Sequence, residues 1–197
     1  MYLNFLQLKI ARQALNLGVR EIGSLIQTSR TTISKLENNI IKVRDMRLAK
    51  KRNAILHEYF RQNNIIFPNE YSVEFSSSYT IAQPPAPIKK LTRFQLKSSR
   101  VILQKSQKEL AELTKTKLFS IIQAEKLSNE SFVKSEKFRD ISSLINMFYK
   151  NGIKYPNYFS ISFKKIVDKV SIHAPGRKEK VGRKIIKKTS DKLSYKW

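Results

Sequence analysis

The chain has 197 residues, 41% of them apolar and 10% aromatic, and carries 39 Lys and Arg against 15 Asp and Glu, a formal net charge of +24. This apolar content excludes a disordered polycation, so we expect a folded basic protein whose partner is a polyanion. Cysteine is absent and only two histidines are present, which excludes disulfides, thiolate metal sites and a cysteine nucleophile and argues against a histidine-rich metal site.

The first three predicted elements are short helices. An apolar stripe at helical spacing predicts a helix over residues 4–15. A second short helix is expected over 19–26, and Thr28 or Ser29 can cap a third over 30–37. Two short helices separated by a tight turn form a helix-turn-helix.

A different pattern follows this helical part. A longer amphipathic helix is predicted over residues 46–62, and alternation around a Pro-Asn turn predicts a small β-hairpin over 65–75. The Ser- and Pro-rich segment 76–90 is typical of a semi-stiff extended linker. Residues 164–197 carry the highest net charge for their length, +9, and suit either a flexible arm that grips phosphates or a solvated cationic extension.

The chain contains an internal repeat. A shift of 88 residues aligns residues 3–75 with 91–163 without a gap, and 19 of the 73 aligned positions are identical. Two amphipathic helical stretches can agree by coincidence, but helix periodicity does not produce the shared Pro-Asn pair and terminal Phe. We therefore expect a first domain over 1–75, a linker over 76–90, a second domain over 91–163 and a basic tail over 164–197.

The first unit resembles a known family, the lambda-repressor-like or Xre-type helix-turn-helix domains of bacterial and phage regulators. The resembling stretches are Gln7-Leu8-Lys9 through Arg12, Glu21-Ile22-Gly23-Ser24-Leu25, and Ser29 through Asn38. In that family an arginine of the first helix pairs with a glutamate at the end of the recognition helix, and the matching residues are Arg12 and Glu37. The second unit repeats the pair as Arg100 and Glu125. The resemblance thus implies two tandem domains of this type.

A recognition helix enters the major groove and offers side chains that hydrogen-bond to base edges. The residues that meet this description in the first unit are Ser29, Arg30, Thr31, Thr32, Ser34 and Lys35. The family match places Arg30, Thr31 and Lys35 at base-reading positions, and Arg30 can take guanine O6 and N7 as a bidentate pair. The alternative is a capped, solvated helix start, because Ser and Thr favour such positions in any helix.

Phosphate contacts position a protein on the duplex without specifying sequence. The residues expected to make them are Arg20, Lys42, Arg44 and Arg47 in the first unit and Gln107, Lys108, Lys115 and Lys117 in the second. The Arg12–Glu37 and Arg100–Glu125 pairs are expected to be structural.

The second unit departs from the family pattern. Leu118, Phe119 and Gln123 stand where the first unit has its three base-reading positions. If the fold is retained, Leu118 and Phe119 lie exposed beside each other, and exposed apolar patches usually mark contact sites. We therefore expect a protein interface there, with the first unit, another chain or an RNA polymerase subunit as partner. The alternative is a shifted helix start that buries Phe119.

These observations predict a mostly α protein with two tandem lambda-repressor-like helix-turn-helix domains, each ending in a small β-hairpin, and a basic C-terminal tail. The expected function is sequence-specific binding of double-stranded DNA in transcriptional control, with the first repeat as reader. The unequal recognition helices argue against a palindromic site read by one monomer and favour a homodimer joined through the second units or the hairpins.

Two rival functions remain at this stage. One is a protein-interaction adaptor or antitoxin-like partner on the same scaffold, and the other is non-specific architectural binding of nucleic acid. We expect no enzymatic activity, no cofactor, no metal and no membrane association, because no catalytic constellation, signal-peptide core or long apolar run is present. The expected location is the cytoplasm, in association with the nucleoid.

Overall fold

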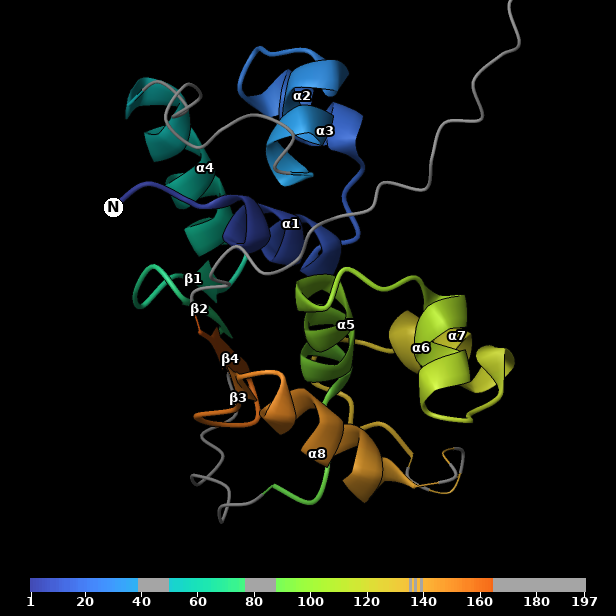
Figure 1. Ribbon diagram of the computed structural model, residues 1–197. Coiled ribbons are helices and arrows are strands. Elements are labelled where there is room, and N and C mark those ends of the chain that lie inside the picture. The colour runs from blue at the N-terminus through green and yellow to red at the C-terminus, as the bar shows by residue number, and fades with distance from the viewer. Residues whose placement is uncertain (39–49, 77–87, 135, 137, 139, 165–197) are drawn as a thin grey trace, which may run out of the picture. The chain divides into compact units, whose positions relative to one another are not determined.

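Two equivalent sets of elements follow one another in the computed structural model, which describes residues 1–38, 50–76, 88–134, 136, 138 and 140–164. The first set comprises α1 (Phe5–Ala14), α2 (Val19–Leu25), α3 (Arg30–Glu37), α4 (Lys50–Gln62), β1 (Ile65–Ile66) and β2 (Ser72–Phe75). The second set comprises α5 (Arg93–Ile102), α6 (Gln107–Leu113), α7 (Leu118–Lys126), α8 (Ile141–Lys150), β3 (Ile153–Lys154) and β4 (Ser160–Phe163) (Figure 1). The expected mostly α class, with a small antiparallel sheet, is confirmed.

The first helix of each set begins at a capping box. Asn4 Oδ1 accepts the backbone N–H of Gln7 at 2.9 Å, and Gln7 Oε1 accepts that of Asn4 at 3.2 Å. Thr92 and Gln95 form the same reciprocal box before α5. Because such caps are encoded within four residues, the sequence predicts these helix starts well. The predicted helix over 46–62 is described from Lys50 onward, and its earlier residues lie outside the described part.

The two repeats also share equivalent hydrogen bonds and backbone conformations. Gln7 Nε2 donates to the carbonyl of Asn69 at 2.7 Å, and Gln95 Nε2 donates to that of Asn157 at 2.8 Å. Each glutamine thereby joins the first helix of its repeat to its hairpin turn. The described residues with left-handed φ are three matched pairs, Asn16 with Gln104, Gln27 with Lys115 and Asn64 with Gly152. The two repeats therefore follow the same chain path through their turns.

The two hairpins form a single four-stranded antiparallel sheet in the order β1-β2-β4-β3. The hairpins themselves are as predicted, but their union is not visible in the sequence. At the centre β2 pairs with β4, and Val73 lies opposite Ile161. These residues are 88 positions apart, so each faces its own counterpart in the other repeat.

The hydrogen bonds that flank this central pair are also equivalent. The backbone N–H of Phe75 donates to the carbonyl of Phe159 at 2.8 Å, and that of Phe163 donates to the carbonyl of Tyr71 at 2.9 Å. Exchanging the repeats converts one bond into the other. An approximate two-fold axis therefore passes between β2 and β4, as it would at the interface of a symmetric dimer.

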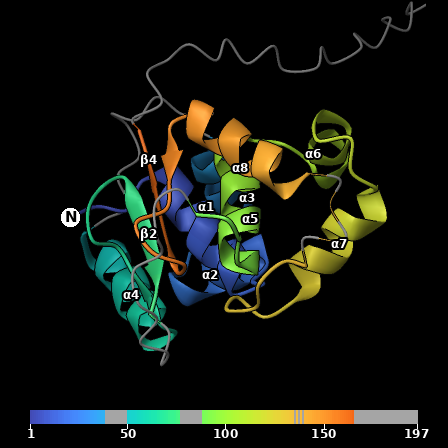
Figure 2. The ribbon, with the colours of Figure 1, turned by 90° about the horizontal axis from the view of Figure 1, so that it is seen from below.

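The helices α1 and α5 lie side by side, as Figures 1 and 2 both show, and Arg93 joins them. This arginine is only 1% exposed. It donates to Ala14 O at 3.0 Å and to Asn16 Oδ1 at 2.6 Å in the first repeat. Within its own repeat it donates to Glu125 O at 3.1 Å and to Asn129 Oδ1. A buried guanidinium with several acceptors is a strong structural tie between the repeats.

Residues Met1–Lys165 form one compact unit with a continuous hydrophobic cluster drawn from both repeats. The sequence predicts separate domains over 1–75 and 91–163, whereas in the structure these share a sheet and a core. Ile88, within the predicted linker, is buried. The rest of that linker is mostly outside the described residues, and so is the predicted basic tail after its first residue, Lys164.

Candidate nucleic-acid interface

The helix α3 is anchored by one face and turns the other outward. Ile33 is fully buried and Glu37 is 4% exposed. Arg30, Thr31 and Lys35 are exposed. Periodicity explains the division, because positions three and four apart share a face of a helix. These three outward residues belong to the set for which base reading is predicted.

The remaining predicted base-reading residues have local partners. Ser29 is the N-cap of α3, and its Oγ accepts the backbone N–H of Thr32 at 3.1 Å. The hydroxyls of Ser29 and Thr32 are also 2.9 Å apart and hydrogen-bonded. Ser34 is half-buried and accepts a long hydrogen bond, 3.5 Å, from Asn38 Nδ2. The outward set therefore consists of Arg30, Thr31 and Lys35.

A buried ion pair fixes the far end of α3 against α1. Arg12 donates from Nε to Glu37 Oε1 and from Nη2 to Glu37 Oε2, both at 2.6 Å. The side chains are 11% and 4% exposed. Arg12 Nη1 also donates to Leu17 O at 2.6 Å, which ties the pair to the turn before α2. The predicted pair is present, and it joins α1 to α3 and to the turn before α2.

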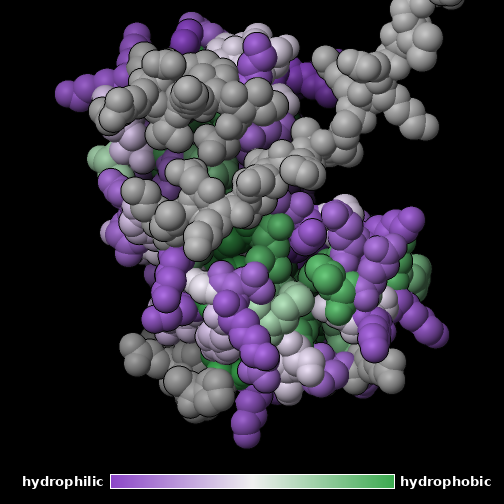
Figure 3. Space-filling view, viewed as in Figure 1, coloured by the Kyte–Doolittle hydropathy of each residue, from purple (hydrophilic) through white to green (hydrophobic). Residues whose placement is uncertain are grey.

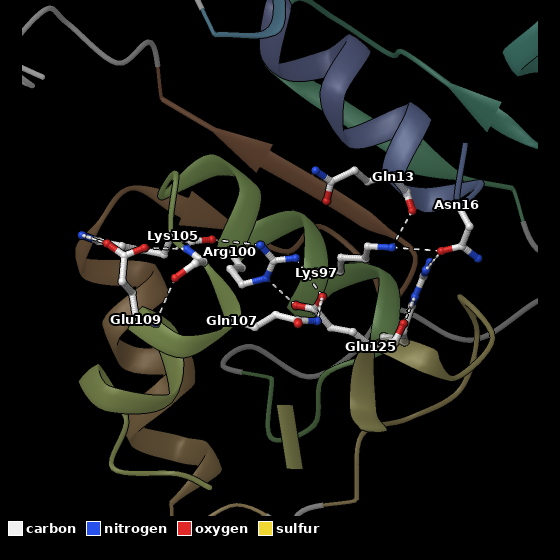
Figure 4. Close-up of polar contacts among 10 residues, drawn as sticks. Gln13, Asn16, Lys97, Arg100, Lys105, Gln107, Glu109 and Glu125 are labelled. Atoms are coloured by element: carbon white, nitrogen blue, oxygen red, sulfur yellow. Dashed lines mark hydrogen bonds and ion pairs between the residues drawn. The ribbon is translucent and has the colours of Figure 1, made fainter. Parts of the chain in front are cut away.

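The second predicted ion pair is present in the same geometry. Arg100 donates to the two carboxylate oxygens of Glu125 at 2.5 and 2.8 Å and to Lys105 O at 2.9 Å. Gln107 Nε2 adds a third bond to Glu125, at 2.9 Å. Figure 4 shows these side chains converging between α5, α6 and α7. Burial and bidentate bonding together make each pair a rigid joint.

The eight residues predicted to contact phosphate fall into three groups. Those that are exposed, around the starts of α2, α6 and α7, are Arg20, Lys108, Lys115 and Lys117. Gln107 has one amide hydrogen committed to Glu125, so it is not a purely outward donor. Lys42, Arg44 and Arg47 lie outside the described residues.

Arg52 in α4 is a cation that sequence reasoning did not identify. It is exposed, and its Nη2 donates to Gln27 O at 3.1 Å in the turn between α2 and α3. Helical periodicity indicates an outward position for Arg52, but periodicity does not show which other element lies beside it. The contact places an exposed positive charge at the turn that precedes α3.

The helix α7 presents an apolar surface where α3 presents a polar one. Leu118 is 40% exposed and Phe119 is 68% exposed, and Leu113 at the end of α6 is 56% exposed. The space-filling view shows hydrophobic side chains over α6 and α7 among hydrophilic ones (Figure 3). Because α7 begins at Leu118, a shifted start that buries Phe119 is excluded.

An open recess of about 670 Å³ lies beside the ion pair of the second repeat. Its lining comes from both repeats and comprises Asn16, Lys97, Arg100, Gln107, Ile122, Glu125 and Lys126. Lys97 Nζ donates to Gln13 O at 2.8 Å and to Asn16 Oδ1 at 3.0 Å (Figure 4). Burial, and next the neighbouring positive charge of Arg93, lower the pKa of Lys97 to about 8. Its cation is thus used to join α5 to the end of α1.

No family model matches the chain, and it has no match among the curated proteins or the solved structures. Within the part of the chain that the structure describes, no group of three or more His, Asp or Glu residues is arranged to hold a metal ion. None of the described helices is long and apolar enough to cross a membrane.

Proposed function

We propose that the chain is a sequence-specific double-stranded DNA-binding protein of the lambda-repressor-like helix-turn-helix type, that α3 is its recognition helix, and that it regulates transcription in the cytoplasm. The observation that carries the proposal is the outward face of α3. Arg30, Thr31 and Lys35 are exposed together on a short helix whose opposite face is buried. A helix of this kind fits the major groove of B-DNA.

The chemistry of this face suits base edges. An arginine can donate two parallel hydrogen bonds to guanine O6 and N7, which is worth roughly 1–3 kcal/mol of discrimination. Thr31 offers both a hydroxyl and a methyl group, and the methyl can pack against that of thymine. Arg20 in α2 and Arg52, which contacts the turn before α3, are exposed cations that can bind phosphates.

Rigidity supports the same function. Binding costs less free energy when the helix that carries the base-reading side chains is already held in place before binding. The cap at Ser29 fixes the start of α3, and the Arg12–Glu37 pair fixes its end. A recognition helix held at both ends loses little conformational freedom when it enters the groove.

Selection from a random duplex library at about 150 mM salt tests the proposal, because charge-driven binding is weak there whereas specific binding persists. We expect the intact chain to select a defined motif and Arg30→Ala/Lys35→Ala to lose it. The matched control is Lys150→Ala/Lys154→Ala, which removes two exposed cations from the end of α8 and from β3. This control should select the motif of the intact chain.

Two results would contradict the proposal. Equal binding of all sequences by the intact chain would leave non-specific nucleic-acid binding. No DNA binding at about 150 mM salt would leave a protein adaptor, for which the exposed Leu118 and Phe119 are the available surface.

A further inference from the structure

The two-fold axis between Val73 and Ile161 relates α3 to α7 as well as β2 to β4. A shift of 88 residues carries Arg30, the first residue of α3, onto Leu118, the first residue of α7. The ion pair at the end of each helix is the same, and so are the left-handed turns before them. The two helices therefore occupy equivalent places in one compact unit.

Two of the three outward positions of α7 have lost the capacity to form hydrogen bonds with bases, and the third, Gln123, is half-buried. Leu118 and Phe119 replace Arg30 and Thr31, and neither has a donor or acceptor on its side chain. A thymine methyl is the only base-edge group that such side chains contact favourably. The exposed part of this face, Leu118 and Phe119, is therefore unsuited to reading a guanine, a cytosine or an adenine.

Lysines replace neutral residues at both ends of the same helix, although its outward face has lost the cations Arg30 and Lys35. Three neutral residues of the first repeat are replaced by lysine in the second: Gln27 by Lys115, Ser29 by Lys117 and Asn38 by Lys126. A fourth lysine, Lys108, replaces Arg20. All four lysines are exposed. Lysine is a sequence-independent point-charge partner for phosphate. A protein interface at Leu118 and Phe119 would not by itself require these four lysines.

We propose that a single chain holds one duplex through both repeats, with α3 reading one half-site and α7 clamping the phosphates of the next half-site without reading its bases. This inference rests on the proposed function. It replaces the expected homodimer joined through the hairpins, because β2 and β4 already pair inside one chain and leave only the two-residue strands β1 and β3 at the edges of the sheet. Leu118 and Phe119 then line the groove at the second half-site.

The first experiment removes two of the added lysines. The variant Lys115→Gln/Lys117→Ser installs the residues of the first repeat, and Gln27 shows that glutamine adopts the left-handed φ at this position. We expect affinity to fall by the same factor for the selected site and for mismatched sites. The slope of log K against log salt should decrease by about 1.8, at roughly 0.9 per lost contact. The control Lys150→Gln/Lys154→Gln should leave affinity and slope unchanged.

The second experiment compares motif, footprint and stoichiometry for the intact chain. The half-sites of helix-turn-helix dimers lie about one DNA turn, 10–10.5 base pairs, apart, and we expect the same spacing for α3 and α7. We expect the selected motif to cover one half-site while the nuclease footprint extends about one further turn on one side. Native mass spectrometry should give one chain per duplex. Truncating the duplex on the extended side should weaken binding, and truncating it on the other flank should not.

The inference and the proposed function fail in different ways. If the intact chain selects no motif, the proposed function fails. If it selects a motif but two chains bind each duplex, or the footprint ends with the motif, the inference alone is overturned. The inference is also overturned if Lys115→Gln/Lys117→Ser behaves like its control, or if Leu118→Ser/Phe119→Ser abolishes chain association and leaves DNA affinity unchanged.

Discussion

Val73 lies opposite Ile161, its own counterpart in the second repeat, at the centre of a sheet to which both repeats contribute. Both side chains are fully buried. An interface that could have joined two chains therefore lies within one chain, and we expect the stability of each repeat to depend on the other.

The first prediction concerns this shared centre. Ile161→Ala should cost about 2–5 kcal/mol, because it removes buried methyl groups and leaves a cavity. Hydrogen exchange should accelerate in α1 as well as in α5, since both belong to the same compact unit. Mass spectrometry of exchanged peptides measures this, with Ile66→Ala on the exposed edge strand as the control. Loss of protection confined to the second repeat would show that the repeats unfold independently.

The second prediction concerns the buried ion pair of the first repeat. The single changes Arg12→Met and Glu37→Leu should each lower the free energy of unfolding by about 3–5 kcal/mol, because each leaves one charge of the pair buried without its partner. The double variant Arg12→Met/Glu37→Leu should cost less than the sum of the two single changes, since no charge remains unpaired. Urea denaturation of all four proteins gives the coupling. Strict additivity would show that the pair contributes nothing as a pair.

The third prediction concerns Arg93. Arg93→Met should destabilise the unit by about 3 kcal/mol or more, because it leaves several buried acceptors on both repeats without a donor. Arg93→Lys should recover little of the lost stability, since an ammonium group cannot reproduce the planar set of donors of a guanidinium. Chemical denaturation measures both variants, and Arg61→Met, at an exposed pair with Glu58, is the control. Equal costs for Arg93→Met and the control would contradict the tie between the repeats.

The fourth prediction concerns pH. The pKa of Lys97 is about 8 in the folded chain, against 10.5 for an unperturbed lysine. Between these values the unfolded chain binds more protons than the folded chain, so this group makes stability rise with pH over that window and adds no slope below it. The charged groups that act on Lys97 are Arg93, Glu125, Arg100 and Arg12.

Lys97→Met isolates this contribution from the other groups that titrate at high pH. The difference in free energy of unfolding between the intact chain and the variant should shift in favour of the intact chain from pH 8 to pH 10. Urea denaturation at one-unit intervals provides the measurement. If the difference in free energy of unfolding stays constant from pH 8 to pH 10, the pKa of Lys97 is not lowered in the folded chain.

Much of the local structure follows from the sequence by itself. The 88-residue shift predicts two copies of one chain path, and the capping residues Asn4 and Ser29 mark where helices begin. The ion pair between Arg12 and Glu37 follows from the family resemblance. These features are predictable because the information lies within a few residues, or in a motif whose spacing is preserved.

The tertiary structure decided how the two copies meet. The hairpin edges carry backbone donors and acceptors that are the same in any sequence, so the residues do not say whether β2 pairs with β4 of its own chain or with another chain. The burial of Arg93 and the lowered pKa of Lys97 result from the packing of the two repeats against each other. The hydrogen-bond acceptors of both side chains lie about 80 residues away, in the first repeat. Sequence periodicity describes one helix at a time, whereas these contacts exist only after α1 and α5 have packed together.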